Sequence, residues 1–261
     1  MLINTVILLL RDLLPIVILL SYLRAFITPT AFSLKNMRNI AVSSLLFVLL
    51  FIQIVEPISE WFNGTGLELI QIGFISLSFC LLSVVTVLKL LERNIPLSVV
   101  LASIAMEAFI VIKTSNFFVF LHVYLQDKTQ FINVLTGVIL GLGICLSAGA
   151  IFYYLLKEWQ DSSLNLLLYL LWFLFLAGMF SQVLPLLAQI DLVTLSAPVW
   201  HSEHIIANGS EYGQLLAALV GYQSAPSLEY LWLYGGIFLV LSILTLALQL
   251  RSKKAQGISD E

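Results

Sequence analysis

Charged side chains are scarce in this sequence: Asp, Glu, Lys and Arg make up only 10% of its 261 residues, whereas 60% are hydrophobic. Soluble domains carry about 25% charged residues, so a water-soluble fold of this size could not bury so much apolar side chain. No long stretch of Lys and Arg is present to follow a phosphate backbone, which excludes a nucleic-acid partner. We therefore expect an integral membrane protein that uses the lipid bilayer as its solvent.

Cysteine and histidine are rare as well. Cys80 and Cys145 both lie in apolar runs without a CxxC partner or a nearby histidine, so we interpret them as small core residues. A bis-histidine haem site needs paired histidines at membrane depth, and only His122 lies near that depth. We expect no enzyme activity and no permanently bound cofactor.

Long apolar runs are what the sequence has instead. A hydrocarbon core about 30 Å thick needs about 20 apolar residues of helix. Turn and helix-start residues separate seven such runs: residues 2–26, 39–58, 66–91, 96–126, 131–156, 163–189 and 227–250. The predicted fold class is an all-α integral membrane protein with seven transmembrane helices in one domain, residues 1–250. Residues 190–226 form the longest loop, with a short interfacial helix near 214–220, and residues 251–261 form a tail.

Basic residues predict the orientation of these spans. Lysine and arginine collect in cytoplasmic loops. Only Lys128 falls on one side of the predicted membrane, and nine basic residues fall on the other: Arg24, Lys35, Arg38, Lys89, Arg93, Lys157, Arg251, Lys253 and Lys254. We therefore expect the amino terminus outside, the carboxyl terminus in the cytoplasm and residues 190–226 outside. The expected location is the plasma membrane, or the inner membrane of a bacterium.

Four ionisable residues lie inside the predicted spans: Arg11 and Asp12 in the first, and Glu107 and Lys113 in the fourth. Charge near the bilayer centre is costly, so each of them is a candidate functional residue. The first and fourth spans run in opposite directions and hold matching places in a three-plus-three inverted repeat followed by a final helix. Transporters of that design bind their solute between the repeats at mid-depth.

A purely structural role is an equal alternative for these four residues. Their charges sum to zero, so Arg11 with Glu107, and Asp12 with Lys113, could form interhelical ion pairs that only join helices. A cation site instead needs a surplus of carboxylate oxygen. The sequence leaves both interpretations open.

Small residues in the fifth span predict close helix packing. Gly137 and Gly141 form a GxxxG motif, and Gly143 and Gly149 follow. In the sixth span, Gln182 and Pro185 are candidates to line a cavity or to produce a kink.

The long loop contains a weak metal-binding pattern. If this segment is helical, His201 and His204 share one face and Glu203 lies close by, which would allow transient metal capture. Two histidines without a third fixed ligand are a weak signal, and a solvated loop is the simpler interpretation.

Two stretches resemble the high-affinity, oxidase-dependent iron permease family. Residues 212–216 (Tyr-Gly-Gln-Leu-Leu), 221–223 (Gly-Tyr-Gln) and 225–227 (Ala-Pro-Ser) resemble the outer loop and last span of that family. Residues 126–127 (Gln-Asp) and the glycines of 137–149 resemble the segment after its second motif. The resemblance covers nearly the whole chain and implies seven spans with an external amino terminus.

The signature of that family is Arg-Glu-x-x-Glu in spans one and four. Residues 11–15 read Arg-Asp-Leu-Leu-Pro, so Arg11 matches, Asp12 stands for the first glutamate and Pro15 replaces the second. The corresponding window in span four, residues 111–115, contains Lys113 and no carboxylate, and Glu107 lies one turn upstream. We describe the chain as a divergent member with degenerate motifs.

The resemblance implies transport of iron or another metal cation. Asp12, with Glu107, would supply the anionic metal ligands, and Arg11 and Lys113 the counter-charges. It also implies an external oxidase, cytochrome or peroxidase partner. The alternative is a non-transporting membrane subunit of the same fold that anchors or scaffolds a redox or metal-handling complex.

Overall fold

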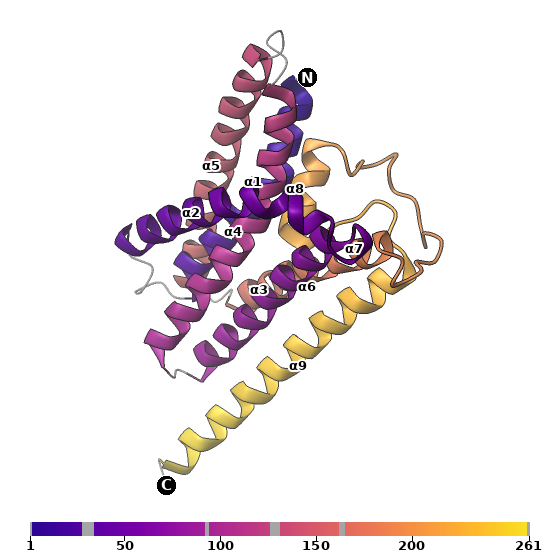
Figure 1. Cartoon of the computed structure of the whole chain (residues 1–261). Coiled ribbons are helices and arrows are strands. Elements are labelled where there is room, and N and C mark those ends of the chain that lie inside the picture. Colours follow the sequence, from indigo (N-terminus) through magenta and orange to yellow (C-terminus); the bar gives the residue numbers. More distant parts are fainter. Residues whose placement is uncertain (1, 28–33, 92–93, 126–130, 162–164, 260–261) are drawn as a thin grey trace.

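The structure, a computed structural model, describes residues 2–27, 34–91, 94–125, 131–161 and 165–259 (Figure 1). The regular elements within these ranges are all helical: α1 (Leu2–Tyr22), the π-helix η1 (Leu23–Ile27), α2 (Leu34–Ser59), the 3₁₀-helix η2 (Trp61–Asn63), α3 (Gly66–Leu90), α4 (Ile95–Leu125), α5 (Phe131–Asp161), α6 (Asn165–Ser181), α7 (Val183–Gln189), α8 (Glu211–Val220) and α9 (Leu228–Ser259).

The predicted all-α fold with seven membrane-length helices is confirmed. Seven segments in the described residues are long and apolar enough to cross a membrane: Leu2–Ile27, Met37–Val55, Gly66–Leu90, Ile95–Ser115, Ile132–Gln160, Leu166–Gln189 and Leu228–Leu248. Each overlaps one predicted span. The helix α9 continues to Ser259 and so includes most of the segment predicted as a tail.

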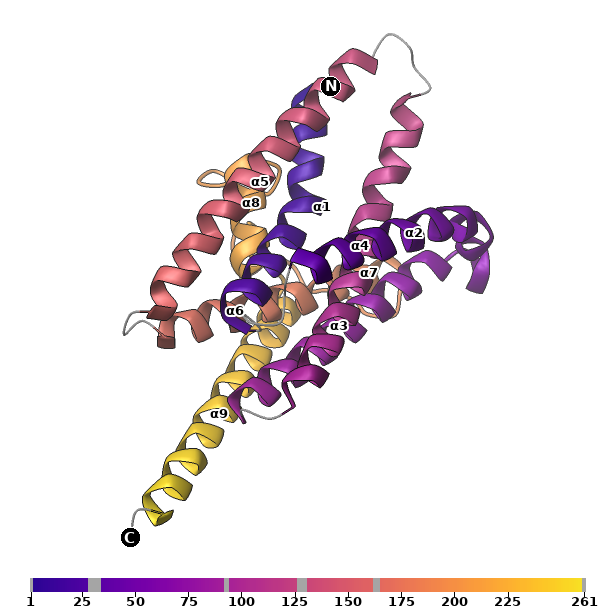
Figure 2. The same ribbon diagram turned by 90° about the vertical axis from the view of Figure 1, so that its left-hand side faces the viewer.

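The start of α1 and the end of α9 lie at opposite ends of the bundle in both views (Figures 1 and 2). This placement agrees with an odd number of crossings. Which end faces the cytoplasm stays a prediction from the lysine and arginine distribution, as does the inverted repeat.

The first span is the centre of the bundle and the last lies at its edge. Within their apolar windows, 67% of the residues of the first span are buried, against 11% for the seventh. The helix α1 packs against α4, α5 and α8, whereas α9 packs mainly against α6 (Figure 2). Side chains on α1 are therefore in a position to line an internal site.

Small residues set the close contact between α1 and α5. A Cβ atom added at Gly137 would lie 2.8 Å from the Cβ of Thr5, and one at Gly141 would lie 3.2 Å from Leu9. Gly149 likewise faces α1, and its carbonyl accepts a 3.1 Å hydrogen bond from the hydroxyl of Ser21. The predicted packing role of the GxxxG motif is confirmed.

A break divides the sixth span into α6 and α7 at Gln182. Pro185 has no backbone N–H, so it cannot donate the helical hydrogen bond to the carbonyl of Ser181, and its ring crowds that carbonyl. The helix is therefore interrupted where Gln182 and Pro185 predicted an irregularity, and the missing hydrogen bond of Pro185 is a physical reason for it.

A long connection, residues 190–227, joins α7 to α9 and contains α8. The hydroxyl of Ser210 caps α8 by accepting a 3.0 Å hydrogen bond from the N–H of Gly213. Gly221 ends α8 in the left-handed region, with φ of 69°. The predicted helix near residues 214–220 is confirmed, and it packs against α1 and α6 (Figure 1).

Candidate functional site

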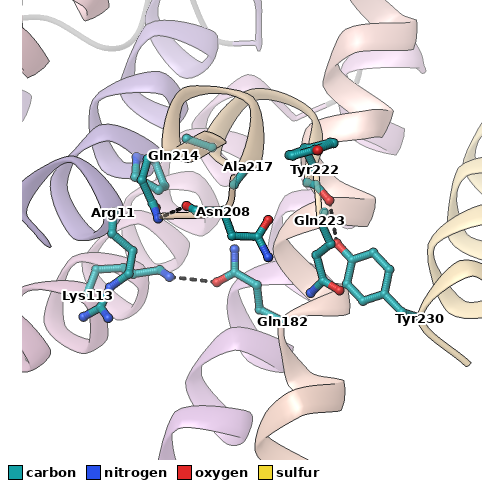
Figure 3. A pocket seen from close by; sticks show the side chains of 13 residues that line it. Arg11, Lys113, Gln182, Asn208, Gln214, Ala217, Tyr222, Gln223 and Tyr230 are labelled. Atoms are coloured by element: carbon teal, nitrogen blue, oxygen red, sulfur yellow. Dashed lines mark hydrogen bonds between the residues drawn. The ribbon is translucent and has the colours of Figure 1, made fainter. Parts of the chain in front are cut away.

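A polar cavity of about 260 Å³ lies between α1, α4, α6 and α8 (Figure 3). We call it the Arg11–Lys113 cavity. Its lining combines two cationic side chains with amides and phenols: Arg11, Pro15, Lys113, Gly178, Gln182, Asn208, Gln214, Ala217, Ala218, Gly221, Tyr222, Gln223 and Tyr230.

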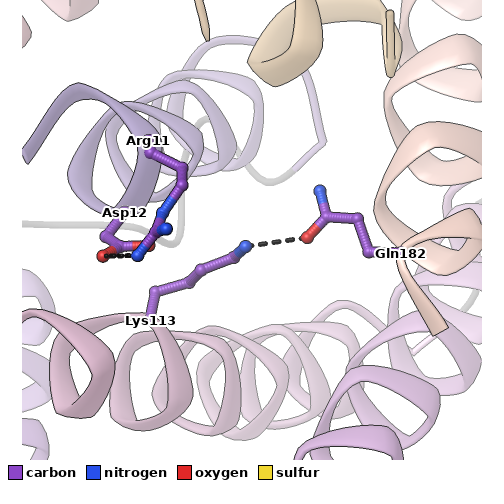
Figure 4. A network of polar contacts seen from close by, with 4 residues as sticks. All are labelled: Arg11, Asp12, Lys113 and Gln182. Atoms are coloured by element: carbon purple, nitrogen blue, oxygen red, sulfur yellow. Dashed lines mark hydrogen bonds and ion pairs between the residues drawn. The ribbon is translucent and has the colours of Figure 1, made fainter. Parts of the chain in front are cut away.

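The first span contributes a charged pair to this site. Arg11 donates to the neighbouring Asp12 from two nitrogens, with Nε to Oδ1 at 3.1 Å and Nη2 to Oδ2 at 3.0 Å (Figure 4). The Asp12 side chain is only 5% exposed, while that of Arg11 is 51% exposed. Arg11 therefore neutralises a buried carboxylate and keeps part of its guanidinium open to the cavity.

Pro15 lies one helical turn beyond Arg11 and also lines the cavity. Because proline has no N–H, the carbonyl of Arg11 receives no helical hydrogen bond from position 15. The sixth span has the same arrangement, with Pro185 four residues after Ser181. A proline thus removes one backbone hydrogen bond from each of these two spans; Pro15 lines the cavity, whereas Pro185 lies three residues after the lining residue Gln182.

The fourth span contributes Lys113. Its Nζ donates a 2.7 Å hydrogen bond to Oε1 of Gln182 at the break between α6 and α7. In Figure 4 the lysine extends past the Arg11–Asp12 pair toward Gln182. Lys113 also lines a second, mainly apolar cavity of about 190 Å³, which it shares with Asp12.

The α7–α9 connection completes the lining with amide groups. Gln214 donates from Nε2 to the carbonyl of Asn208 at 2.7 Å, and the Asn208 side-chain oxygen accepts from the N–H of Ser224 at 2.8 Å. The hydroxyl of Tyr222 donates to the carbonyl of Ile206 at 2.9 Å. These bonds hold the connection against the cavity (Figure 3).

Two glycines hold α8 against α6. A Cβ atom added at Gly178 would lie 2.5 Å from the Cα of Gly221, which is closer than real Cβ contacts come. Both glycines line the cavity. The position of the amide groups therefore depends on this backbone-to-backbone contact.

The four charged residues predicted as a mid-membrane cluster do not all meet. Arg11, Asp12 and Lys113 lie together, but Glu107 lines a separate cavity of about 430 Å³ among aromatic and aliphatic side chains of α2, α3 and α4. Its Oε1 accepts a 2.6 Å hydrogen bond from the hydroxyl of Ser43. Six residues along a helix rotate a side chain by about 240°, which places Glu107 and Lys113 on different faces of α4.

The two interhelical ion pairs considered from the sequence are therefore replaced by other contacts. Among the described residues, the ion pair recorded for Arg11 is with its neighbour Asp12 rather than with Glu107. Lys113 bonds to the neutral amide of Gln182 rather than to Asp12.

Metal-ligating side chains are not grouped in the part of the chain that the structure describes. Within it, no three His, Cys, Asp or Glu residues could hold one metal ion together. His201, Glu203 and His204 are exposed and lie outside any helix, so the helical face on which their metal role depended is not formed. Asp12 and Glu107 line different cavities.

Other predicted features are placed as follows. Cys145 is buried, while Cys80 is exposed on the surface of α3 rather than in the core, and both are free thiols. His122 belongs to α4, but its side chain lies outside the described residues, as do residues 126–127 of the family resemblance.

Sequence reasoning missed that the α7–α9 connection lines the cavity. Asn208 and Gln223 had no apparent link to Arg11, and residues 221–223 carried only the resemblance. The sequence does contain a signal for the end of α8, because Gly221 follows a helical pattern and glycine is a typical C-terminal cap. That signal does not reveal which helices α8 packs against.

Comparison with known protein families, with curated proteins and with solved structures finds no match for this chain. The resemblance to iron permeases therefore stays a prediction.

Proposed function

We propose that this protein is a multi-pass membrane transporter whose solute binds in the Arg11–Lys113 cavity. The observation that carries the proposal is that this polar cavity lies beside Pro15 of α1 and beside Gln182, where the sixth span divides into α6 and α7. Interrupted helices are typical of transporter binding sites.

The energetic cost of the charges supports the same proposal. Arg11, Asp12 and Lys113 lie within segments long and apolar enough to cross the membrane. An ionisable residue at mid-span costs about 2.5–3.5 kcal/mol on insertion scales. Helix packing alone does not need a lysine there, whereas a polar solute does.

Iron or another metal cation is the solute that the family resemblance predicts, and this part of the proposal rests on the resemblance alone. The plasma-membrane location and an external oxidase, cytochrome or peroxidase partner belong to the same proposal. In the cavity a cation would meet two cationic side chains, Arg11 and Lys113, while the nearest carboxylate, Asp12, is already bonded to Arg11.

The second candidate is a non-transporting membrane subunit that scaffolds a partner complex. Its supporting observation is that Lys113 already bonds to Gln182 and joins α4 to the sixth span. Such a contact would also serve a purely structural role.

Uptake by proteoliposomes separates the two candidates. We would reconstitute the full chain and measure accumulation of radiolabelled iron and, separately, of radiolabelled lactate. Transport predicts uptake of one of these probes well above protein-free liposomes, and its loss in Lys113→Met. Loss of iron uptake in Asp12→Asn would favour the metal assignment.

The matched control is Lys157→Met, because Lys157 is an exposed residue of α5 that does not belong to the cavity lining. Its uptake should equal that of the wild type. Background uptake of both probes by correctly folded wild-type protein would reject the transporter proposal in favour of the scaffold.

A further inference from the structure

The Arg11–Lys113 cavity is rich in hydrogen-bond donors. Lys113 carries three N–H groups and Arg11 five. The recorded bonds use one N–H of Lys113, toward Gln182, and two of Arg11, toward Asp12. Within the part of the chain that the structure describes, no other hydrogen bond involves these two side chains, so their remaining N–H groups are available to a ligand in the cavity that both residues line.

Amide groups on the other walls add further donors. The Oε1 atom of Gln182 accepts from Lys113, so its NH₂ group is left to donate, and in Figure 3 this side chain points into the cavity. The Asn208 side chain accepts with its oxygen from the N–H of Ser224, so its NH₂ group is also left to donate. Gln223 lies on the same wall.

Two polar side chains near this space, those of Asp12 and Tyr230, already form hydrogen bonds. The carboxylate of Asp12 accepts two hydrogen bonds from Arg11 and lines the neighbouring cavity rather than this one. The hydroxyl of Tyr230 donates to the carbonyl of Gly221 at 2.6 Å. The two charged residues of the lining, Arg11 and Lys113, present only N–H groups to a ligand.

The net charge of the side chains at this site also favours an anionic ligand. Arg11 and Asp12 form a neutral pair, so Lys113 adds one positive charge at the site when it is protonated. A buried charge without a counter-charge is costly, and an anion in the cavity would offset that cost.

We propose that this cavity binds a small organic anion with a single carboxylate. The carboxylate accepts hydrogen bonds from Lys113 and Arg11, and the amides of Gln182 and Asn208 bond polar atoms on the rest of the molecule. This inference deepens the proposed function by naming a substrate class for the same site. It differs from the metal-cation expectation, since the ligand bears the opposite charge.

The volume of the cavity and the charge of its lining narrow the class of organic anions that would fit. The cavity, at about 260 Å³, is below the range of about 300–1,000 Å³ that is typical of drug-sized ligands. A monocarboxylate brings the site to neutrality, whereas the dianion of inorganic phosphate overshoots it. Lactate and benzoate are suitable probes because each carries one carboxylate on a small body.

Equilibrium binding tests the inference without any need for transport. The full chain in nanodiscs of zwitterionic lipid would be dialysed against radiolabelled lactate, with benzoate, lactamide and inorganic phosphate as competitors. We expect saturable binding of one lactate per chain, competition by benzoate, and at least tenfold weaker competition by lactamide and phosphate.

Variants locate the site. Lys113→Met should weaken lactate binding at least tenfold, Lys113→Arg should retain most of it because the charge and donors remain, and Lys157→Met should match the wild type. Near-ultraviolet circular dichroism of each variant would verify its fold. Absence of lactate binding, equal binding of lactamide, tighter binding of phosphate, or wild-type affinity in folded Lys113→Met would each overturn the inference.

The binding experiment tests the anion site and the uptake experiment tests transport, so either proposal can be rejected without the other. Lactate binding without uptake of any probe would support the anion site and reject transport. Iron uptake without lactate binding would support transport and reject the anion site.

Discussion

Lys113 of α4 donates a 2.7 Å hydrogen bond to Gln182, the residue at which the sixth span breaks. The contact joins two spans far apart in sequence (Figure 4) and uses the amide oxygen of Gln182, which lines the cavity. Because Pro185 removes a helical hydrogen bond next to Gln182, we expect this proline to influence where the partner of the half-buried Lys113 lies.

The Pro185→Ala substitution should therefore alter the cavity by moving Gln182, although Pro185 itself does not line the cavity. Alanine restores the N–H that can donate to the carbonyl of Ser181, so α6 and α7 should merge into one helix. We expect stronger hydrogen–deuterium exchange protection across residues 181–187, together with weaker lactate binding because Gln182 turns away from Lys113.

Leu184→Ala is the control for this substitution, because Leu184 is a buried neighbour in the same helix that leaves the backbone ladder unchanged. It should lower stability through lost packing without raising exchange protection. Unchanged protection in Pro185→Ala would mean that tertiary contacts, and not the proline, produce the break.

Removal of Arg11 should be more damaging than removal of the charge on its partner. Arg11→Leu leaves the buried Asp12 carboxylate without its two hydrogen bonds, and an unsatisfied buried group costs about 1–3 kcal/mol or more when charged. Asp12→Asn leaves an arginine that is half exposed and retains contact with the cavity. Thermal unfolding in detergent should show the larger loss for Arg11→Leu.

The double variant Arg11→Leu with Asp12→Asn, compared with the two single variants, measures the contribution of the pair. Because it removes both charges, it should recover much of the stability lost in Arg11→Leu alone. A double variant as unstable as the sum of the two single changes would show that the pair contributes little to folding.

Much of the architecture could be predicted from composition and spacing. Seven apolar runs gave the seven spans, and the spacing of Gly137 and Gly141 gave the α1–α5 contact. Arg11, Asp12 and Lys113 were identifiable because charge is rare in apolar helices. These features depend on residue type and on the spacing of residues along a helix, and both can be read directly from the sequence.

The rest of the site depends on how distant segments pack. The amide wall from Asn208 and Gln223 reaches the cavity only because Gly221 meets Gly178, a contact between α8 and α6 that no local pattern specifies. The separation of Glu107 from Lys113 follows from helical rotation. The sequence was enough to predict that Glu107 and Lys113 lie on different faces of α4. It was not enough to predict which of these faces meets α1.

The two glycines at that contact should be intolerant of any side chain. Gly178→Ala places a methyl group against the backbone of Gly221, so α8 must move away from α6. Gly221 also has a positive φ, which alanine adopts only with strain. We expect Gly178→Ala and Gly221→Ala both to lose lactate binding and to unfold at lower temperature than the wild type.

Gly143→Ala is the matched control on α5, because a Cβ atom there meets open space. Alanine favours a helix over glycine by about 1 kcal/mol, so this variant should be as stable as the wild type or more stable. Wild-type lactate affinity in Gly178→Ala would show that α8 is not needed to form the site.

Glu107 should be dispensable for binding in the Arg11–Lys113 cavity. It lines a different cavity, with apolar neighbours and a hydrogen bond from Ser43, on another face of α4 from Lys113. The Glu107→Gln substitution keeps an oxygen that can accept from Ser43 and removes only the ionisable group. We expect its lactate affinity to stay within about twofold of the wild type, a difference below about 0.4 kcal/mol, when it is measured by the same equilibrium dialysis. Binding or uptake that is lost in Glu107→Gln, with the fold intact, would move the solute path to the cavity between α2, α3 and α4 and would restore the carboxylate to the role that the family resemblance gives it.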